Sequence, residues 1–252
     1  RIKREEKLKK ELEEEQRGKK HVLKQGEEFQ SDLGIIKADV LDNAEVGDEI
    51  KSHNDHSFKI IKPNINDFID VMERRCSILL KKDIGYVLAH TGLGAGSRVV
   101  DAGTGAGAIA LNFGNVVGSQ GHVYTYEIRE DFAEIAKRNI DNFGIENITV
   151  KNQNIKDGID EDNIDLVFLD LPKPFEIFEE VYDCLNVGGW LAVYAPYIDQ
   201  AKLSYRIAKK VGFYDIDISE ILQRGLEVRQ NGVRPKTRMV GHSGYLLFAR
   251  KL

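Results

Sequence analysis

A glycine-rich turn in the middle of the chain constrains the fold more than any other feature of this sequence. Residues 98–102 have the apolar pattern of a buried strand, and the segment Asp101-Ala-Gly-Thr-Gly-Ala-Gly107 overlaps its end. A helical pattern follows over residues 106–116. A strand, a glycine turn and a helix in this order bring backbone N–H groups close to a nucleotide-like ligand. The sequence therefore predicts an α/β fold with a ligand site at this turn.

Strand and helix patterns alternate from residue 96 to the end of the chain. Because the last two strand patterns have no helix between them, we expect a sheet whose final strand is antiparallel, and we interpret residues 223–243 as a polar loop. The predicted strands are Arg98–Ala102, His122–Tyr126, Ile148–Lys151, Asp165–Leu169, Trp190–Tyr194, Tyr214–Ile221 and Tyr245–Arg250. The predicted helices are Ala106–Val116, Arg129–Phe143, Phe175–Cys184 and Gln200–Val211.

Two shorter segments precede this alternating region. Residues 1–20 are almost entirely Lys, Arg and Glu, which predicts a charged helix or arm. Residues 21–62 carry short β-like pieces at 21–23, 34–40, 49–51 and 58–61, and we predict a small all-β domain there. Helical patterns at 65–72 and 83–90 lead into the main domain, which we place at 63–252.

Composition excludes several classes of protein. A net charge of −5 argues against a surface that binds nucleic acid everywhere. The apolar runs are too short to span a membrane, so no membrane is expected. The two cysteines, Cys76 and Cys184, are far apart and lack metal-ligand spacing. We therefore expect no metal, no disulfide framework and a cytoplasmic location.

Acidic residues at the strand ends favour one kind of ligand. Gly103, Gly105 and Ala108 also fit the dinucleotide-binding fingerprint. However, Asp101 would repel a pyrophosphate at the helix N-terminus, whereas it can pair with the ammonium group of an amino-acid ligand. Glu127 ends the next strand, at about the offset where an acid binds ribose hydroxyls. S-adenosylmethionine carries both groups, so we predict it as the cofactor.

The fourth strand is followed by a proline-rich turn, Asp170-Leu-Pro-Lys-Pro-Phe175. The two prolines fix the turn and hold the Asp170 carboxylate at the ligand edge of the sheet, and Phe175 offers an apolar face on which a base can stack. The alternative is that Asp170 only caps the following helix.

A basic stretch stands out in the otherwise acidic chain. Between residues 223 and 238, five basic residues and one acid give a local charge of five minus one, or +4. This stretch predicts phosphate contacts, and a merely solvated loop is the alternative. The basic residues are Arg224, Arg229, Arg234, Lys236 and Arg238.

Six motifs taken together are specific. They are Asp101-Ala-Gly-Thr-Gly-Ala-Gly107, Tyr126-Glu127, Leu169-Asp-Leu-Pro-x-Pro174, Gly188-Gly189 leading to Tyr194-x-Pro196, Arg234-Pro235, and Gly241-His-Ser-Gly-Tyr245. With them the chain resembles, over residues 21–252, the tRNA adenine-58 N1-methyltransferase family of the archaeal and bacterial homo-oligomeric type. The resemblance implies a class I, Rossmann-like methyltransferase fold and S-adenosylmethionine as cofactor. It also implies a homotetramer that methylates N1 of adenine 58 in the T-loop of tRNA, with some archaeal members acting on adenine 57 as well.

The strand ends and the resemblance together give a candidate site without a metal. Asp170 is the candidate catalytic residue, because a carboxylate near the 6-amino group can stabilise the charge that develops when N1 is alkylated, or take the amino proton. The cofactor-binding candidates are Asp101, Gly103, Thr104, Gly105, Ala106, Gly107, Glu127, Ile128, Asn154, Ile155 and Asp170. The substrate-binding candidates are Phe175, Tyr194, Arg224, Arg234 and His242, although His242 also suits a structural role.

The chain departs from the family pattern in one stretch that bears on the substrate. Where the family has an aromatic or imidazole side chain, this chain has Leu80, although Lys82-Asp83 remains. The missing ring leaves a second enzyme class open, a small-molecule methyltransferase acting on a corrinoid-like precursor. A silent binding subunit is a third class, and the presence of Asp101, Glu127 and Asp170 argues against it.

Overall fold

The computed structural model describes His21 and residues 26–252 apart from residue 230. The predicted charged helix or arm at 1–20 lies outside the described residues, as does most of the predicted strand piece at 21–23. The chain divides into two compact units between Met72 and Glu73, whereas the sequence analysis places a boundary after Lys62.

In its described residues, the first unit contains two antiparallel β-hairpins and two helices. Its elements are β1 (Phe29–Ser31), β2 (Gly34–Ile36), α2 (Ala38–Asp42), β3 (Glu49–Lys51), β4 (Ser57–Lys59) and α3 (Ile65–Val71). The Ser52 hydroxyl donates to the Leu33 carbonyl at 2.7 Å, which joins one hairpin to the other. The side chain of Asn64 caps α3 by accepting two backbone N–H bonds.

The expectation of an all-β first domain is wrong at one place. The predicted β-like piece at 34–40 ends at Ile36, and α2 begins at Ala38. Ala38 and Leu41 are good helix formers, and Asp39 lies in the first turn, where the helix dipole favours an acid. These local helix preferences outweigh the short β-like pattern at 34–40 on which the strand prediction rested.

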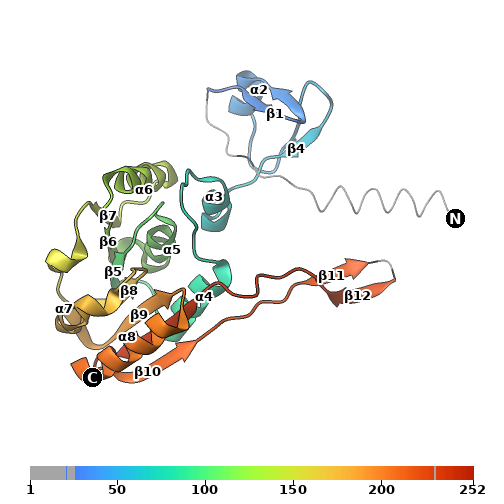
Figure 1. Ribbon diagram of the computed structural model, residues 1–252. Helices are drawn as coiled ribbons and strands as arrows, with labels where there is room; N and C mark the ends of the chain where they lie inside the picture. Colours follow the sequence, from blue (N-terminus) through green and yellow to red (C-terminus); the bar gives the residue numbers. More distant parts are fainter. Residues whose placement is uncertain (1–20, 22–25, 230) are drawn as a thin grey trace. The chain divides into compact units, whose positions relative to one another are not determined.

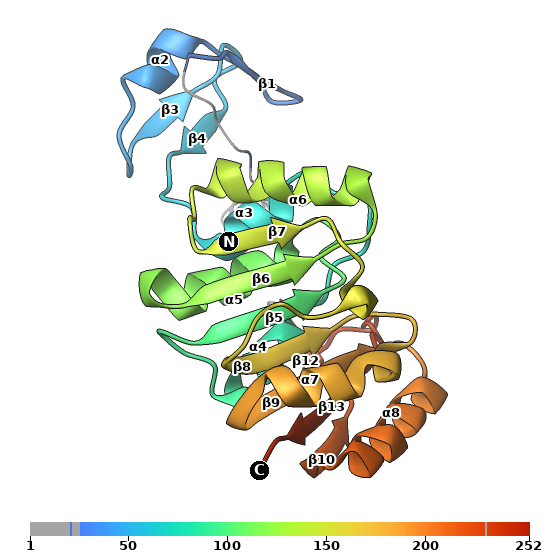
Figure 2. The ribbon, with the colours of Figure 1, turned by 90° about the vertical axis from the view of Figure 1, so that its left-hand side faces the viewer.

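The second unit is built on one mixed sheet of seven strands, which confirms the predicted α/β fold with an antiparallel last strand (Figures 1 and 2). The strand order is β10-β13-β9-β8-β5-β6-β7. Strands β5 to β9 pair in parallel, and β13 is antiparallel to both β9 and β10. The strands are β5 (Arg98–Ala102), β6 (His122–Tyr126), β7 (Ile148–Lys151), β8 (Ile164–Leu169), β9 (Leu185–Ala195), β10 (Tyr214–Ser219) and β13 (Tyr245–Arg250).

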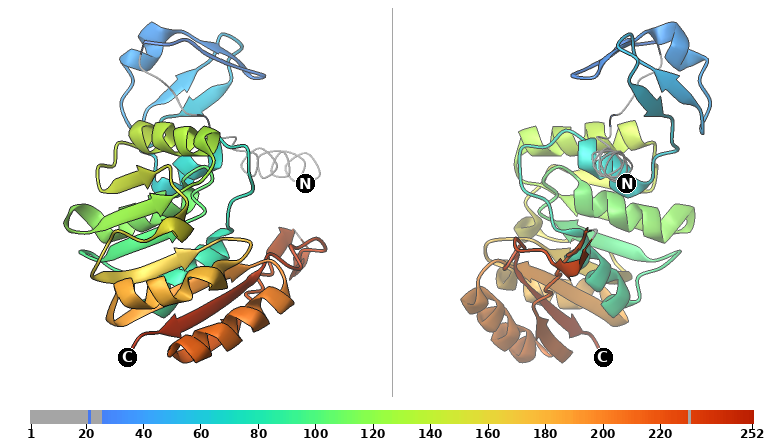
Figure 3. Two further views of the ribbon diagram at one scale, coloured as in Figure 1. Left: turned by 60° about the vertical axis from the view of Figure 1, so that its left-hand side comes forward. Right: turned by 90° about the vertical axis from the view of Figure 1, so that its right-hand side faces the viewer.

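Helices cover both faces of this sheet. Successive residues of a strand face opposite cores, so that Val99 packs with α4 and α5 while Val100 packs with α7 and α8. Figures 2 and 3 show α8 along the β10–β13 end of the sheet. The helices are α4 (Lys81–Thr91), α5 (Ala108–Val117), α6 (Glu130–Phe143), α7 (Phe178–Cys184) and α8 (Ile198–Val211), with short 3₁₀ turns η1 (Gly118–Gln120), η2 (Ile155–Asp157) and η3 (Pro174–Ile177). Within the described residues, no helix is long and apolar enough to cross a membrane.

The predicted polar loop at 223–243 contains a two-stranded hairpin instead. Strands β11 (Leu226–Arg229) and β12 (Gly232–Pro235) pair in antiparallel register and extend away from the sheet (Figure 1). The prediction missed them because charged residues alternate with Leu226, Val228 and Val233, all of which are exposed. Gly232 supplies the positive φ of 142° next to the turn.

Candidate active site

The glycine loop after β5 needs its glycines. Gly103, Gly105 and Gly107 have φ values of 96°, 54° and 88°, which is the left-handed region that other residues rarely adopt. A Cβ atom on Gly103 would lie 2.4 Å from the carbonyl oxygen of Asp170, and one on Gly105 would lie 3.0 Å from the Cys76 sulfur. At Gly103 the loop backbone therefore lies directly against Asp170, the residue after β8, with no room for a side chain.

Asp101 is a buried acid held by a chain of hydroxyl groups. Its side chain accepts a hydrogen bond of 2.6 Å from the Thr125 hydroxyl, and the Thr104 hydroxyl lies 2.6 Å from that of Thr125. Because the Thr125 proton is directed to Asp101, Thr104 is the donor in the second bond. Burial raises the pKa of Asp101 to about 7, and the charges of Asp170 and Glu127 add to this effect. The site thus holds a carboxyl group that is ready to pair with a cation.

Glu127 is buried at the end of β6 and faces the glycine loop. Its carboxylate accepts the Gly105 N–H at 3.0 Å and both the backbone N–H and the Nε–H of Arg129 at 3.1 Å. The Arg129 guanidinium also lies over the Phe132 ring, 3.6 Å from its centre. The sequence alone does not indicate this role of Arg129, because a basic residue two positions after an acid carries no signal of its own.

A pocket of about 360 Å³ opens beside Glu127. Of the predicted cofactor residues, Gly103, Glu127, Ile128, Asn154 and Ile155 line it, whereas Asp101, Thr104, Gly105, Ala106, Gly107 and Asp170 do not. Its other lining residues, which the sequence analysis missed, are Tyr126, Gln153, Lys156, Leu171, Pro172 and Lys173. All of them are near predicted site residues in the sequence. Including the residues that flank each strand end in the predicted site would therefore have found them.

The rim of this pocket carries charged groups from two short turns. The Asn154 side chain accepts the Lys156 N–H at 3.1 Å and so caps η2. Lys156 of η2 forms an ion pair with Glu176 of η3, and Lys173 lies 3.5 Å from the same carboxylate. The two turns are therefore joined at the pocket.

Asp170 lies where β8 ends, against the glycine loop. Its backbone N–H donates to the Ala102 carbonyl at 2.9 Å. Burial raises the pKa of its carboxyl group to about 6, and within the described part of the chain no hydrogen bond to that group is found. The alternative that Asp170 caps the following helix is wrong, because the N-cap residues of η3 and α7 are Lys173 and Ile177.

The predicted substrate residues lie on different parts of the second unit. Phe175 packs against the core on the α7–α8 face, whereas Tyr194 packs against the core on the α4–α5 face, and its hydroxyl donates to the Ser243 carbonyl. Among the described residues no ring contact joins Phe175 and Tyr194. Arg224 precedes the hairpin, and Arg234 on β12 lies 3.2 Å from Glu227.

His242 has partners at both ring nitrogens. Nδ1 lies 2.6 Å from a Glu220 carboxylate oxygen, and Nε2 lies 2.9 Å from the Pro196 carbonyl oxygen. The Glu220 carboxylate and this carbonyl raise the pKa of His242. These contacts agree with the structural alternative for this histidine.

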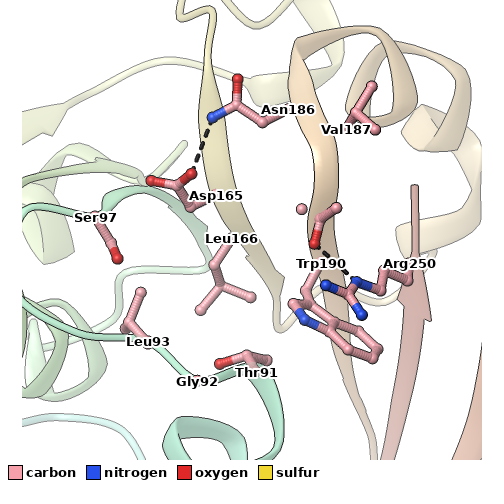
Figure 4. A pocket seen from close by; sticks show the side chains of 12 residues that line it. Thr91, Gly92, Leu93, Ser97, Asp165, Leu166, Asn186, Val187, Trp190 and Arg250 are labelled. Carbon is pink, nitrogen blue, oxygen red and sulfur yellow. Dashed lines mark hydrogen bonds between the residues drawn. The ribbon is translucent and has the colours of Figure 1, made fainter. Parts of the chain in front are cut away.

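A second pocket, of about 340 Å³, lies at the opposite edge of the sheet (Figure 4). Its polar walls are internally paired: Asn186 donates to Asp165 at 2.9 Å, and Arg250 donates to the Gly188 carbonyl at 3.0 Å. It lies by the amino ends of β5 and β8, whereas open α/β sheets bind ligands at the carboxyl ends. None of the predicted site residues lines it.

The strand order, the glycine loop and the buried acids that follow it define a class I methyltransferase that uses S-adenosylmethionine. The family model described as "tRNA methyltransferase complex GCD14 subunit" matches residues 58–234, and this chain belongs to that family. The resemblance inferred from the motifs is thereby confirmed.

Similar proteins agree with this assignment. The chain is 38% identical to the tRNA (adenine(57)-N(1)/adenine(58)-N(1))-methyltransferase TrmI of Methanocaldococcus jannaschii, over 94% of this chain and 93% of that protein. An S-adenosylmethionine-dependent O-methyltransferase structure from Thermotoga maritima matches with a TM-score of 0.84 and 30% identity, covering 92% and 88% of the two chains. The tRNA (m1A58) methyltransferase TrmI structure from Aquifex aeolicus matches with a TM-score of 0.77 and 27% identity, covering 92% of each chain.

Proposed function

We propose that this protein transfers a methyl group from S-adenosylmethionine to N1 of adenine 58 in the T-loop of tRNA, and to the neighbouring adenine 57. The observation that carries the proposal is the position of Asp170, a mostly buried carboxyl group pressed against the glycine loop at the end of β8. The family and the named relatives support the substrate. The corrinoid-precursor alternative is not favoured, because the precorrin-enzyme structures that match are only 16–17% identical and this similarity shows the fold alone.

The residues of the second unit fit the cofactor. A Cβ atom would fill the space at Gly103, and Asp101 is a buried acid with no cationic partner among the described residues. Asp101 would hold the ammonium end, Glu127 the ribose, and Asn154 and Ile155 the adenine end of S-adenosylmethionine. When bound, the cofactor supplies an activated methyl group on its sulfonium.

Asp170 would act on the acceptor base. Adenine N1 has a free lone pair, so it needs alignment and a group that stabilises the positive charge formed on alkylation. With a pKa of about 6, the Asp170 carboxyl group is mostly ionised at neutral pH. It would accept a hydrogen bond from the 6-amino group and take its proton as the charge develops. N1 lies on the pairing edge, so the base must leave its stack, and Phe175 and Tyr194 are candidates to contact it.

The arm between residues 223 and 243 would bind the tRNA backbone. Its local charge of +4 supports phosphate contact through Arg224 and Arg234. Glu227 already pairs with Arg229 and Arg234, so phosphate binding would exchange one anion for another. The arm with its basic residues also distinguishes a tRNA substrate from a small molecule.

The same hairpin supports self-assembly into a homotetramer. Leu226 pairs with Pro235 and Val228 with Val233, so these side chains share one face, and Leu226, Val228 and Val233 are each more than half exposed. A two-stranded hairpin with an open apolar face is marginally stable alone, and a second copy of the chain would cover it. Native mass spectrometry checks this, and a monomer at micromolar concentration would contradict it.

Asp170→Asn tests the function. We expect wild-type protein with cofactor to form 1-methyladenosine at position 58 of unmodified tRNA, detected by nucleoside mass spectrometry. The variant should keep cofactor affinity but lose about 10²–10⁴-fold in single-turnover rate. Asp199→Asn, an exposed acid in the first turn of α8, is the matched control and should not change the rate. A variant within a few-fold of wild type would show that Asp170 has no role in the transfer.

A further inference from the structure

Three distant parts of the second unit meet at Ser243, just before β13. The Ser243 hydroxyl accepts a hydrogen bond of 2.6 Å from the Lys82 ammonium and donates one of 2.9 Å to Asp83. Lys82 and Asp83, in the first turn of α4, also pair with each other at 2.7 Å. The Ser243 carbonyl accepts the hydroxyl of Tyr194, near the end of β9. One residue thus connects a buried ion pair to a predicted substrate side chain.

The stability of the fold does not explain this ion pair. The side chains of Lys82 and Asp83 are only 6% and 1% exposed. Removing two charges from water costs several kcal/mol per ion, and apolar residues of similar volume in place of such a pair are often neutral or stabilising. The pair therefore needs another reason, and the residue that it holds is Ser243.

The backbone after Ser243 is packed tightly onto the Tyr194 ring. A Cβ atom on Gly244 would lie 2.4 Å from Cζ of Tyr194, so only glycine fits there. Burial raises the pKa of the Tyr194 hydroxyl, and the negative charges of Asp83 and Asp170 add to this effect. The Tyr194 ring is therefore fixed in place by the backbone of Ser243 and Gly244.

We propose that Ser243 is a positioning residue that fixes Tyr194 for the acceptor base, and that the buried Lys82–Asp83 pair fixes Ser243. This inference rests on the proposed function, because it assigns Tyr194 to the adenine side of the site. It also links the basic segment at 223–243 to the adenine side of the site. His242, the preceding residue, is held by Glu220 and the Pro196 carbonyl, so the segment that ends the arm is anchored next to Tyr194.

Ser243→Ala and Ser243→Thr form the first test. The alanine variant loses both hydroxyl bonds, and we expect its single-turnover methyl transfer to tRNA to fall roughly 10–100-fold, since small misplacements can cost this much. Its affinity for S-adenosylmethionine, measured by calorimetry, should stay within about twofold, since Ser243 bonds to Lys82, Asp83 and Tyr194, none of which is assigned to the cofactor. The threonine variant keeps the hydroxyl and should restore the rate. The matched control is Ser219→Ala, which loses a 2.6 Å bond from a serine to Asp217 in edge strand β10.

A double exchange, Lys82→Met with Asp83→Leu, separates positioning from stability. It leaves no unpaired buried charge, so the variant should melt at or above the wild-type temperature while methyl transfer falls as in Ser243→Ala. A wild-type rate of methyl transfer in Ser243→Ala or in the double variant would overturn the inference. A loss of rate in Ser243→Thr as large as in Ser243→Ala would also overturn it, as would a loss of cofactor affinity in Ser243→Ala that parallels the loss of rate. Wild-type protein that forms no 1-methyladenosine would instead contradict the proposed function.

Discussion

Asp101→Asn should stabilise the protein without cofactor and greatly weaken its thermal response to the cofactor. The Asp101 carboxyl group is buried, and its pKa of about 7 lies far above the ordinary value of 3.8. A group whose pKa is raised on folding binds more protons in the native state, so its contribution to stability is lost as the pH rises from about 4 to 7. At pH 8 the difference of 7 − 3.8, or 3.2 pKa units, corresponds to about 4 kcal/mol of destabilisation.

Asparagine has no charge to lose, so the variant should lack this pH dependence. At pH 5 the wild-type penalty is only about 2 kcal/mol, so the advantage of the variant should grow by roughly 2–3 kcal/mol between pH 5 and pH 8. For a unit of this size, that is on the order of 5–10 °C in melting temperature. Any change in the hydrogen bond from Thr125 adds about equally at both pH values and cancels in the difference.

Thermal melts at pH 5, 6, 7 and 8, with and without S-adenosylmethionine, make the measurement. Saturating cofactor should raise the wild-type melting temperature most at pH 8, where the carboxylate is ionised and can pair with an ammonium group. The Asn variant should respond little, because it cannot form that ion pair. Asp199→Asn, an exposed acid in α8, should follow the wild type. Equal pH slopes for wild type and the Asp101 variant would refute the burial argument.

Four further outcomes are expected. Since burial raises the pKa of Asp170 to about 6, the single-turnover rate should fall about tenfold per unit below pH 6, and a flat profile would remove its role as a base. Glu127→Ala should weaken cofactor binding by about 1.5–3 kcal/mol in calorimetry, and unchanged affinity would reject the ribose assignment. Glu220→Gln should lower the pKa of His242, measured by NMR, because the Glu220 carboxylate raises that pKa. Any contribution of this pair to stability is present at low pH and is lost as the pH rises through the raised pKa of His242. An unchanged His242 titration in the variant would contradict the contact. Reversing the charge of Arg224 should lower the slope of tRNA affinity against salt concentration by about one unit, since one phosphate contact is lost, and an unchanged slope would exclude this surface.

The sheet and its ligand edge could be predicted because buried parallel strands leave a simple signal. The predicted bounds of β5, β6, β7 and β13 agree with the structure. Val99, Val100 and Val123 are fully buried, and runs of such residues between polar turns are typical of strands covered on both faces. Parallel strands end at one edge, so Asp101, at the end of β5, and Asp170, just after β8, could be placed together without the structure.

Contacts between distant residues could not be predicted in the same way. Ser243 meets Lys82 across 161 positions, and Arg138 of α6 lies 3.1 Å from Glu73. Neither pair shares a motif or a period, so only the packing of helices on the sheet brings them together. The β11–β12 hairpin was not predicted for another reason. Val228 and Val233 are both exposed, so neither side of the hairpin has the buried apolar face by which a strand is recognised in a sequence.

The acids inside the second unit fall into two groups, those that pair with a lysine or arginine and those that do not. The acids without such a partner indicate where the cofactor and the acceptor base bind. Asp83 pairs with Lys82, and Glu161 pairs with Lys151, so the charge of each is compensated inside the protein. Among the described residues, no lysine or arginine pairs with Asp101 or Asp170, and burial raises the pKa of both. An uncompensated buried acid costs stability, so these two positions favour groups that arrive from outside: a cofactor ammonium at Asp101 and the positive charge of an alkylated base at Asp170.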